Sequence, residues 1–268
     1  MSKTSQKFII GVDEVGRGPL FGDVVVAAVC FPVELLTVEN LQTSQNLVNA
    51  QNLFNAQNLF TPPDIYQADQ VKIIANHSLT ALTDSKKLST KKRERLFELI
   101  KQHATAFSVI KIAPTVIDEL NILQATLFGM SQAIETIVQT ITQSCCESLP
   151  NAKHFAPEFY VVIDGNQLPN IDHLANATTI KLRSIKLQSI KLRSIVKGDS
   201  KHACISGASV LAKVVRDTDM LAMDKKYPNY GLAKHKGYPT ELHLQAIEKY
   251  GVLPEHRRSF APIKNKLI

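Results

Sequence analysis

The chain has 268 residues, 44% of them hydrophobic, so it can bury a sizeable core in one domain with at most an appendage. Lys and Arg total 31 against 24 Asp and Glu, and this net charge of +7 favours a polyanionic partner without specifying one. No apolar run is long enough to span a membrane, the N-terminus lacks the apolar core of a secretory signal, and the four cysteines lack zinc-ligand spacing. These features predict a soluble cytoplasmic protein with free thiols.

The first predicted elements are two apolar strands, residues 8–13 and 24–31, which we expect to pair as a hairpin. The first strand ends in Asp13 and Glu14, and Gly16-Arg17-Gly18 follows. Burying unpaired carboxylates is costly, so the two acids are expected to bind a divalent metal or to lie exposed at the strand end. Glycines let a backbone approach a ligand closely, and Arg17 adds a cation. Together these residues indicate chemistry on a phosphodiester.

The next segment contains a repeat. Residues 45–60 repeat Gln-Asn-Leu with a period of six, which gives no amphipathic stripe. We therefore interpret residues 35–70 as containing a surface insertion. Ser89 is a good N-cap for a helix over residues 90–103, residues 106–112 alternate like a strand, and residues 114–142 show one continuous helical stripe.

A β-branched strand over residues 158–163 ends at Asp164. Residues 180–194 then repeat Ile-Lys-Leu-Arg/Gln-Ser three times, and a period of five reverses the faces of a strand at every copy. This pattern predicts a second surface-loop insertion, lying between Asp164 and Asp199. A long helix rich in small residues follows over 201–226.

Each acid also has a structural interpretation. Asp164 could serve only an Asp-Gly turn, and Asp199 could be a helix N-cap. Successive strand residues face opposite ways, so Asp13 and Glu14 cannot both point inward from a regular strand. Either the strand bends there or Glu14 has a less direct role. Asp217 lies four residues after Lys213 on the same helix face, where the two can pair.

Several blocks of the sequence resemble, in order, the bacterial ribonuclease HII family, the type 2 ribonucleases H. Those blocks are residues 9–24 (IIGVDEVGRGPLFGDV), 84–89 (DSKKLS), 162–166 (VIDGN), 196–200 (VKGDS), 206–217 (SGASVLAKVVRD), 230–239 (YGLAKHKGYP) and 256–262 (HRRSFAP). Phe21, Asp23 and Gly207 depart from the family pattern, and Asp23 could perturb metal affinity.

The resemblance implies an α/β fold, ribonuclease H-like, with a mixed central sheet flanked by helices and a small helical C-terminal part. Residues 1–226 would form the catalytic domain and 227–268 a substrate-contacting extension. Two Mg²⁺ or Mn²⁺ ions need oxygen ligands and negative charge, and the expected ligands and catalytic residues are Asp13, Glu14, Asp164 and Asp199. Asp217 is expected to support them from a neighbouring position.

The resemblance also implies substrate contacts. Telling RNA from DNA requires contact with the 2′-hydroxyl, for which Gly16, Arg17, Gly18 and Tyr238 are the candidates. The expected phosphate contacts are Lys86, Lys87, Lys234, Lys236, Arg257 and Arg258, whereas His235 and His256 would contact phosphate or pack internally.

Two functions are considered. The first, which the resemblance implies, is a metal-dependent endoribonuclease that cuts the RNA strand of RNA–DNA hybrids and incises duplex DNA 5′ to single ribonucleotides, leaving 3′-hydroxyl and 5′-phosphate ends. The second is a hybrid-binding protein without catalysis, which the intact acid set argues against. We expect a monomer with no obligate protein partner and no membrane association.

Overall fold

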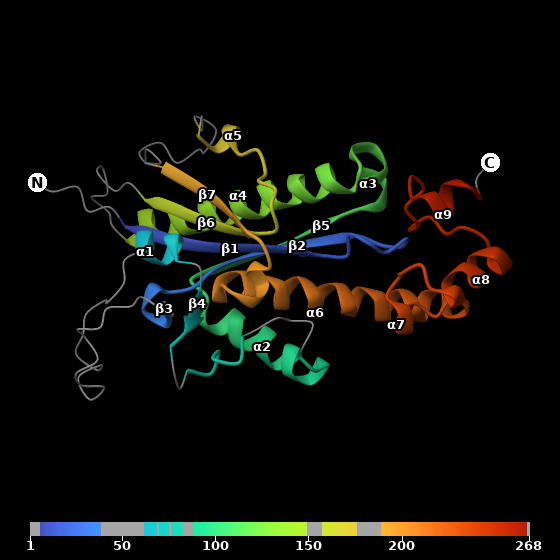
Figure 1. Ribbon diagram of the computed structural model, residues 1–268, viewed down its shortest axis with the longest axis horizontal. Coiled ribbons are helices and arrows are strands. Elements are labelled where there is room, and N and C mark those ends of the chain that lie inside the picture. The colour runs from blue at the N-terminus through green and yellow to red at the C-terminus, as the bar shows by residue number, and fades with distance from the viewer. Residues whose placement is uncertain are drawn as a thin grey trace, which may run out of the picture.

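The computed structural model describes residues 6–38, 62–68, 70–74, 77–82, 88–148, 157–175 and 189–266. Its centre is a five-stranded sheet in the order β5-β2-β1-β6-β7 (Figure 1). The strands are β1 Lys7–Val15, β2 Val24–Cys30, β5 Ala106–Ile112, β6 Glu158–Asp164 and β7 Ser189–Ile195. β1 is antiparallel to β2 and parallel to β6, so the predicted hairpin and the mixed sheet are confirmed.

Helices cover both faces of this sheet (Figure 1). α4 Ile122–Ser148 covers one face and α6 Ala203–Lys226 covers the other, while α3 Pro114–Leu120 packs against α4 and α2 Thr90–His103 packs against α6. Alternate residues of β1 face opposite layers: Ile10 packs in the cluster that contains Ile134 of α4, and Ile9 in the cluster that contains Leu211 of α6. Smaller elements surround this core: η1 Val33–Leu35, β3 Leu36–Val38, α1 Pro62–Gln67, β4 Val71–Ile73 and α5 Asp172–Ala175.

Helix α6 lies unusually close to the sheet because small residues meet at the contact. A Cβ on Gly11 of β1 would lie 2.1 Å from the backbone carbonyl carbon of Cys204. A Cβ on Gly207 would lie 2.9 Å from the Phe31 ring, which explains glycine at this departure from the family pattern. The first turns of α6 are therefore held at a fixed height over β1.

The helix predicted over residues 114–142 is interrupted, and the single-helix prediction is wrong at Asn121. This residue has φ +67°, which ends α3, and its Oδ1 accepts hydrogen bonds from the amides of Leu123 and Gln124. The Asn121 side chain thereby caps the helix that follows. The apolar stripe runs across the break, so the stripe alone does not reveal it.

The surface-loop prediction for residues 180–194 is wrong for the third copy of the repeat, which forms β7 at the sheet edge. Ile190 and Leu192 pack toward α4, whereas Arg193, on the opposite face, donates to the Tyr66 carbonyl of α1. The third copy, Ile190–Ser194, supplies five of the seven residues of this edge strand, so the change of face between copies does not matter. Residues 180–188, and the other repeat at 45–60, lie outside the described residues.

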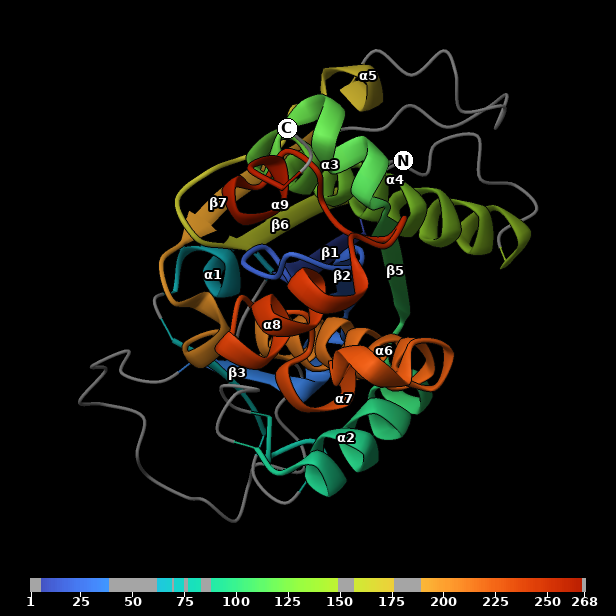
Figure 2. The ribbon, with the colours of Figure 1, turned by 90° about the vertical axis from the view of Figure 1, so that its right-hand side faces the viewer.

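The C-terminal part packs against the loop between β1 and β2 (Figure 2). It contains η4 Pro228–Tyr230, α7 Leu232–His235, α8 Glu241–Tyr250 and α9 Ala261–Lys264. Phe21, another departure from the family pattern, is fully buried there with its ring edge-on to His256, at 5.0 Å between centroids. The predicted α/β architecture with a small helical C-terminal part is confirmed.

Two buried histidines form a neutral pair inside this part. The Nε2 atoms of His243 and His256 lie 3.2 Å apart, and His256 Nδ1 accepts from the Leu253 amide. His256 must therefore donate through Nε2, while His243 donates through Nδ1 to the Tyr238 carbonyl. Burial lowers the pKa of each ring to about 4, and the neighbouring imidazoles add to this effect.

We expect this pair to make the fold acid-sensitive. The unfolded chain binds protons at the ordinary histidine pKa of 6.5, whereas the folded pair resists protonation until about pH 4, so stability falls between these values as pH decreases. Melting curves measured across this range should show the fall. The double variant His243→Gln/His256→Gln should flatten it, and an unchanged slope in that variant would contradict the neutral-pair assignment.

A second prediction concerns the repeat. Deleting residues 180–189 removes two copies and leaves Ile190–Ile195, so the melting temperature should stay within a few degrees of wild type because loop length contributes little. Leu192→Asp should instead destabilise the fold by about 2 kcal/mol, because it places a charge in the α4 interface. Unfolding of the deletion variant would show that the removed copies contribute to the core.

Candidate active site

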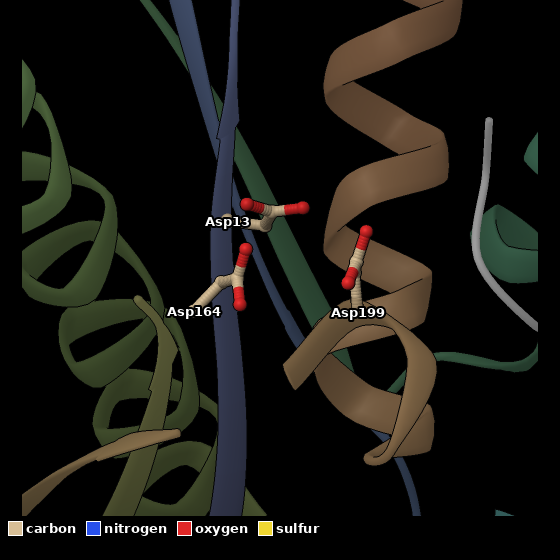
Figure 3. Close-up of side chains that lie close together, drawn as sticks. All are labelled: Asp13, Asp164 and Asp199. Atoms are coloured by element: carbon tan, nitrogen blue, oxygen red, sulfur yellow. The ribbon is translucent and has the colours of Figure 1, made fainter. Parts of the chain in front are cut away.

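Three carboxylates from separate parts of the chain meet where the neighbouring strands β1 and β6 end. Asp13 lies near the end of β1, Asp164 is the last residue of β6, and Asp199 lies in the short helix η3, Gly198–Ser200. Each offers an oxygen within 4.8 Å of the others, and Figure 3 shows the three side chains turned toward one space. Neighbouring parallel strands end at the same edge, which is why Asp13 and Asp164 lie together.

The negative charges of these three carboxylates favour binding of a cation. Asp13 is 4% exposed, and its pKa is raised well above the ordinary value, first by burial and then by the charges of Glu14 and Asp164. Hydrogen bonds from Ser209 and the Glu14 amide oppose this shift in part. Clustered carboxylate oxygens with unfavourable mutual charge are the donor set that a hard divalent cation prefers. The residues therefore fit a divalent metal.

Asp164 and the turn before α6 hold each other in place. Asp164 Oδ1 accepts from the Gly198 amide at 2.6 Å. Lys197 has φ +57°, and a Cβ on Gly198 would lie 2.5 Å from Ile205. This contact with Gly198 gives Asp164 a partner outside its own Asp-Gly turn. The side chain that caps α6 belongs to His202, so the N-cap interpretation of Asp199 is wrong.

Glu14 is not one of the three acids that meet. β1 continues without a bend to Val15, and the Glu14 side chain forms an ion pair with Arg17 at 3.4 Å. Its pKa is raised, chiefly by burial, with the charge of Asp164 adding to the shift and that of Arg17 opposing it. Glu14 therefore lies within electrostatic range of the cluster, on the other side of the strand.

The glycine loop, Gly16–Gly18, lies directly after β1. Gly16 has φ +101°, and a Cβ there would lie 2.5 Å from Arg216 Nε. A Cβ on Gly18 would lie 3.3 Å from the ring of Tyr238, which is 47% exposed. The structure thus brings together Gly18 and Tyr238, two of the predicted ribose contacts, whereas Gly16 faces Arg216, a buried arginine that no sequence motif singled out.

The basic residues expected at phosphates differ in their surroundings. Lys86 and Lys87 lie outside the described residues. Lys236 adopts φ +52° beside Tyr238, and burial lowers the pKa of its amine while the charge of Asp217 opposes that shift.

Arg257 is fully buried, so its assignment as a phosphate contact is wrong. Arginine pairs such as Arg257-Arg258 carry no sequence signal that shows which member lies inside. His235 and His256 are also buried and pack internally.

Asp217 connects two helices. Its carboxylate accepts from Lys213 at 2.7 Å, as the spacing predicts, and Arg93 of α2 lies 3.7 Å away. Asp217 is not among the three carboxylates that meet. Asp23 also lies outside that cluster, and its carboxylate interacts electrostatically with Asp219 and Lys111.

Comparison with known proteins agrees with this geometry. The family model described as Ribonuclease HII matches residues 10–78 and 68–263.

The chain belongs to the ribonuclease HII family.

Its curated relatives include a ribonuclease HII of Psychrobacter sp. (strain PRwf-1), 42% identical over 97% of this chain and 80% of that protein. A ribonuclease HII of Francisella tularensis subsp. novicida is 40% identical over 96% of this chain and 97% of that protein. The resemblance found in the sequence blocks is thereby confirmed. The protein is a type 2 ribonuclease H, a hydrolase whose substrate is the RNA–DNA hybrid.

Solved structures share the fold. Ribonuclease H2 from Pyrococcus horikoshii OT3 has a TM-score of 0.57 at 20% identity, with 96% of each chain covered. The Bst-RNase HIII complex with Mn²⁺ has a TM-score of 0.52 at 16% identity, covering 98% of this chain and 70% of that one. These likenesses confirm the predicted ribonuclease H-like fold.

Members of the ribonuclease HII family depend on a divalent metal, and the three-carboxylate cluster suits one. Within the described part of the chain, no helix is both long and apolar enough to cross a bilayer.

The crowded carboxylates generate a stability prediction. Asp13→Asn keeps the shape of the side chain but removes one buried negative charge, so it should raise the melting temperature by a few degrees in a chelator. The same variant should lose the rise in melting temperature that Mg²⁺ or Mn²⁺ gives the wild type. Asp217→Asn serves as the control and should keep that rise. A full metal-induced rise in Asp13→Asn would exclude Asp13 as a ligand.

Proposed function

We propose that this ribonuclease HII family member cuts duplex DNA 5′ to a single embedded ribonucleotide, as well as the RNA strand of hybrids, and leaves 3′-hydroxyl and 5′-phosphate ends. The observation that supports this most directly is the three-carboxylate cluster, because its member Asp13 is followed three residues later by the glycine loop, against which Tyr238 lies. A hydrolytic centre next to a ribose-reading surface can confine cleavage to a ribonucleotide.

In this proposal Asp13, Asp164 and Asp199 hold the metal, while Glu14, on the other side of β1, has the less direct role of adding negative charge near them. Two divalent ions, Mg²⁺ or Mn²⁺, would supply the Lewis acidity that activates the attacking water and stabilises the departing 3′ oxygen. Burial of Asp13 and Asp199 excludes bulk water, which strengthens electrostatic interactions there. The Gly198 amide keeps Asp164 aimed at the cluster.

The solvent-exposed residues of the glycine loop and the exposed ring of Tyr238 are the proposed contacts to the substrate sugar. Backbone groups of the glycine loop would read the 2′-hydroxyl, because Arg17 and Gly18 face solvent. Tyr238 would pack on the sugar, since its exposed ring already lies against Gly18. Lys86, Lys87 and Lys236 would contact phosphates, while Asp217 would hold Lys213 and Arg93 near the same surface.

The remaining assignments concern organisation. Residues 1–226 would act as the catalytic domain, with residues 227–268 as its substrate-contacting extension. We expect a monomer that works in the cytoplasm without an obligate protein partner.

A nicking assay tests the proposal, using a duplex with one ribonucleotide and its all-deoxy counterpart. Wild type should cut only the first, on the 5′ side of the ribonucleotide. Asp164→Asn and Asp199→Asn should lower the rate by roughly a thousandfold, because each removes a metal ligand. Asp217→Asn should cost about tenfold at most, since it loosens only an ion-paired neighbour. Equal cutting of both duplexes by wild type, or near-normal turnover of Asp199→Asn, would contradict these assignments.

A further inference from the structure

The loop that joins β1 to β2, residues 16–23, follows no regular backbone pattern, so its inward carbonyls need donors from elsewhere. Arg257 supplies three of these donors and is 0% exposed. Its Nη2 donates to Gly16 O at 2.6 Å, its Nη1 to Arg17 O at 2.9 Å and its Nε to Gly22 O at 2.9 Å. All three guanidinium nitrogens are thus committed to this loop.

A second buried arginine, Arg216 of α6, holds the same loop from another side. It is 2% exposed and donates to the carbonyls of Phe21 and Asp23. Its Nη2 also donates to Lys236 O at 3.3 Å, two residues before Tyr238. Arg216 therefore links the β1–β2 loop to the turn that carries Tyr238.

The contacts of Arg257 determine where the outward amides of the loop point. The structure has no cis peptide bond in its described residues, so each carbonyl is directed opposite to the amide of the next residue. With Gly16 O and Arg17 O drawn inward, the amides of Arg17 and Gly18 point outward. Neither amide donates to another backbone group within the described part of the chain. Two donors are thus aimed at solvent beside Tyr238.

Packing alone does not account for two buried guanidinium groups. Burial lowers the pKa of both, that of Arg257 to about 9, and the charge of Arg216 adds to the effect on Arg257. Apolar side chains would fill the same space without this desolvation cost. The carboxylate of Asp23 offsets part of the positive charge on both arginines. Burying both guanidinium groups despite this desolvation cost is explained if they must hold the carbonyls of the β1–β2 loop in one orientation.

We propose that Arg257, assisted by Arg216, is a positioning residue that orients the amides of Arg17 and Gly18 toward the 2′-hydroxyl of the substrate. This inference rests on the proposed ribose-reading role of the glycine loop. It adds a residue that never touches substrate but sets the discrimination between ribose and deoxyribose.

The test compares Arg257→Lys with Arg193→Lys, each made in the cleavage-deficient Asp164→Asn background. Arg193 is a matched control, because it also donates to backbone carbonyls, but to those of Tyr66 and Ala68 rather than to any in the β1–β2 loop. The measured quantity is the ratio of dissociation constants for the all-deoxy duplex and the duplex with one ribonucleotide. Lysine keeps the charge but cannot serve three carbonyls in fixed directions.

Arg257→Lys should reduce this ratio by about tenfold, while affinity for the all-deoxy duplex stays the same. Arg193→Lys should keep the full ratio even if its melting temperature falls. A folded Arg257→Lys that retains the full ratio would overturn the positioning role. If the parent protein shows no preference for the ribonucleotide, the proposed ribose reading itself fails, which is a separate result.

A measurement on the unmodified protein covers the case in which Arg257→Lys does not fold. Backbone ¹⁵N relaxation without substrate should give order parameters near 0.85 for Arg17 and Gly18, the value of rigid backbone. Values below about 0.6 would show that the loop is not held before substrate binds, and the inference would fail.

Discussion

The parallel pairing of β1 with β6 is the constraint on which the rest of the site depends. It places Asp13 beside Asp164 although most of the chain lies between them in sequence. The third acid, Asp199, reaches the same point because α6 is held against β1 at Gly11, where no side chain separates helix from strand. A shift of register between these strands would separate the carboxylates and turn their side chains to the wrong face.

Opposite charges are buried next to one short piece of chain, the end of β1 and the loop that follows it. Buried acids lie at the end of β1, and two buried guanidinium groups lie behind the loop that follows it. Each group alone would be expensive to bury. The acids are suited to a cation from solution, whereas the arginines are occupied by backbone carbonyls. The loop between them is thus constrained on its inner side while its outer side stays open to a ligand.

Much of this arrangement could be predicted from the sequence. Strand and helix positions followed from periodicity and capping, and the ordered motifs indicated the acids and Tyr238. Three features could not be predicted for physical reasons. Asn121 breaks a helix without disturbing its apolar stripe. One copy of a five-residue repeat supplies most of a strand, even though the period of the repeat fits no extended strand. Finally, Arg257 and Arg258 look alike in sequence, and only the tertiary fold decides which one is buried.

The five-residue repeat that ends in β7 also has a genetic consequence. Each unit begins with Ile-Lys-Leu and ends with serine, so the residues that precede Ile190 read almost the same whether two or three units are present. Replication slippage within the corresponding stretch of the gene would add or remove whole units while leaving the edge strand itself unaltered. Because β7 keeps its residues, we expect related isolates to differ in the number of units without differing in enzyme activity.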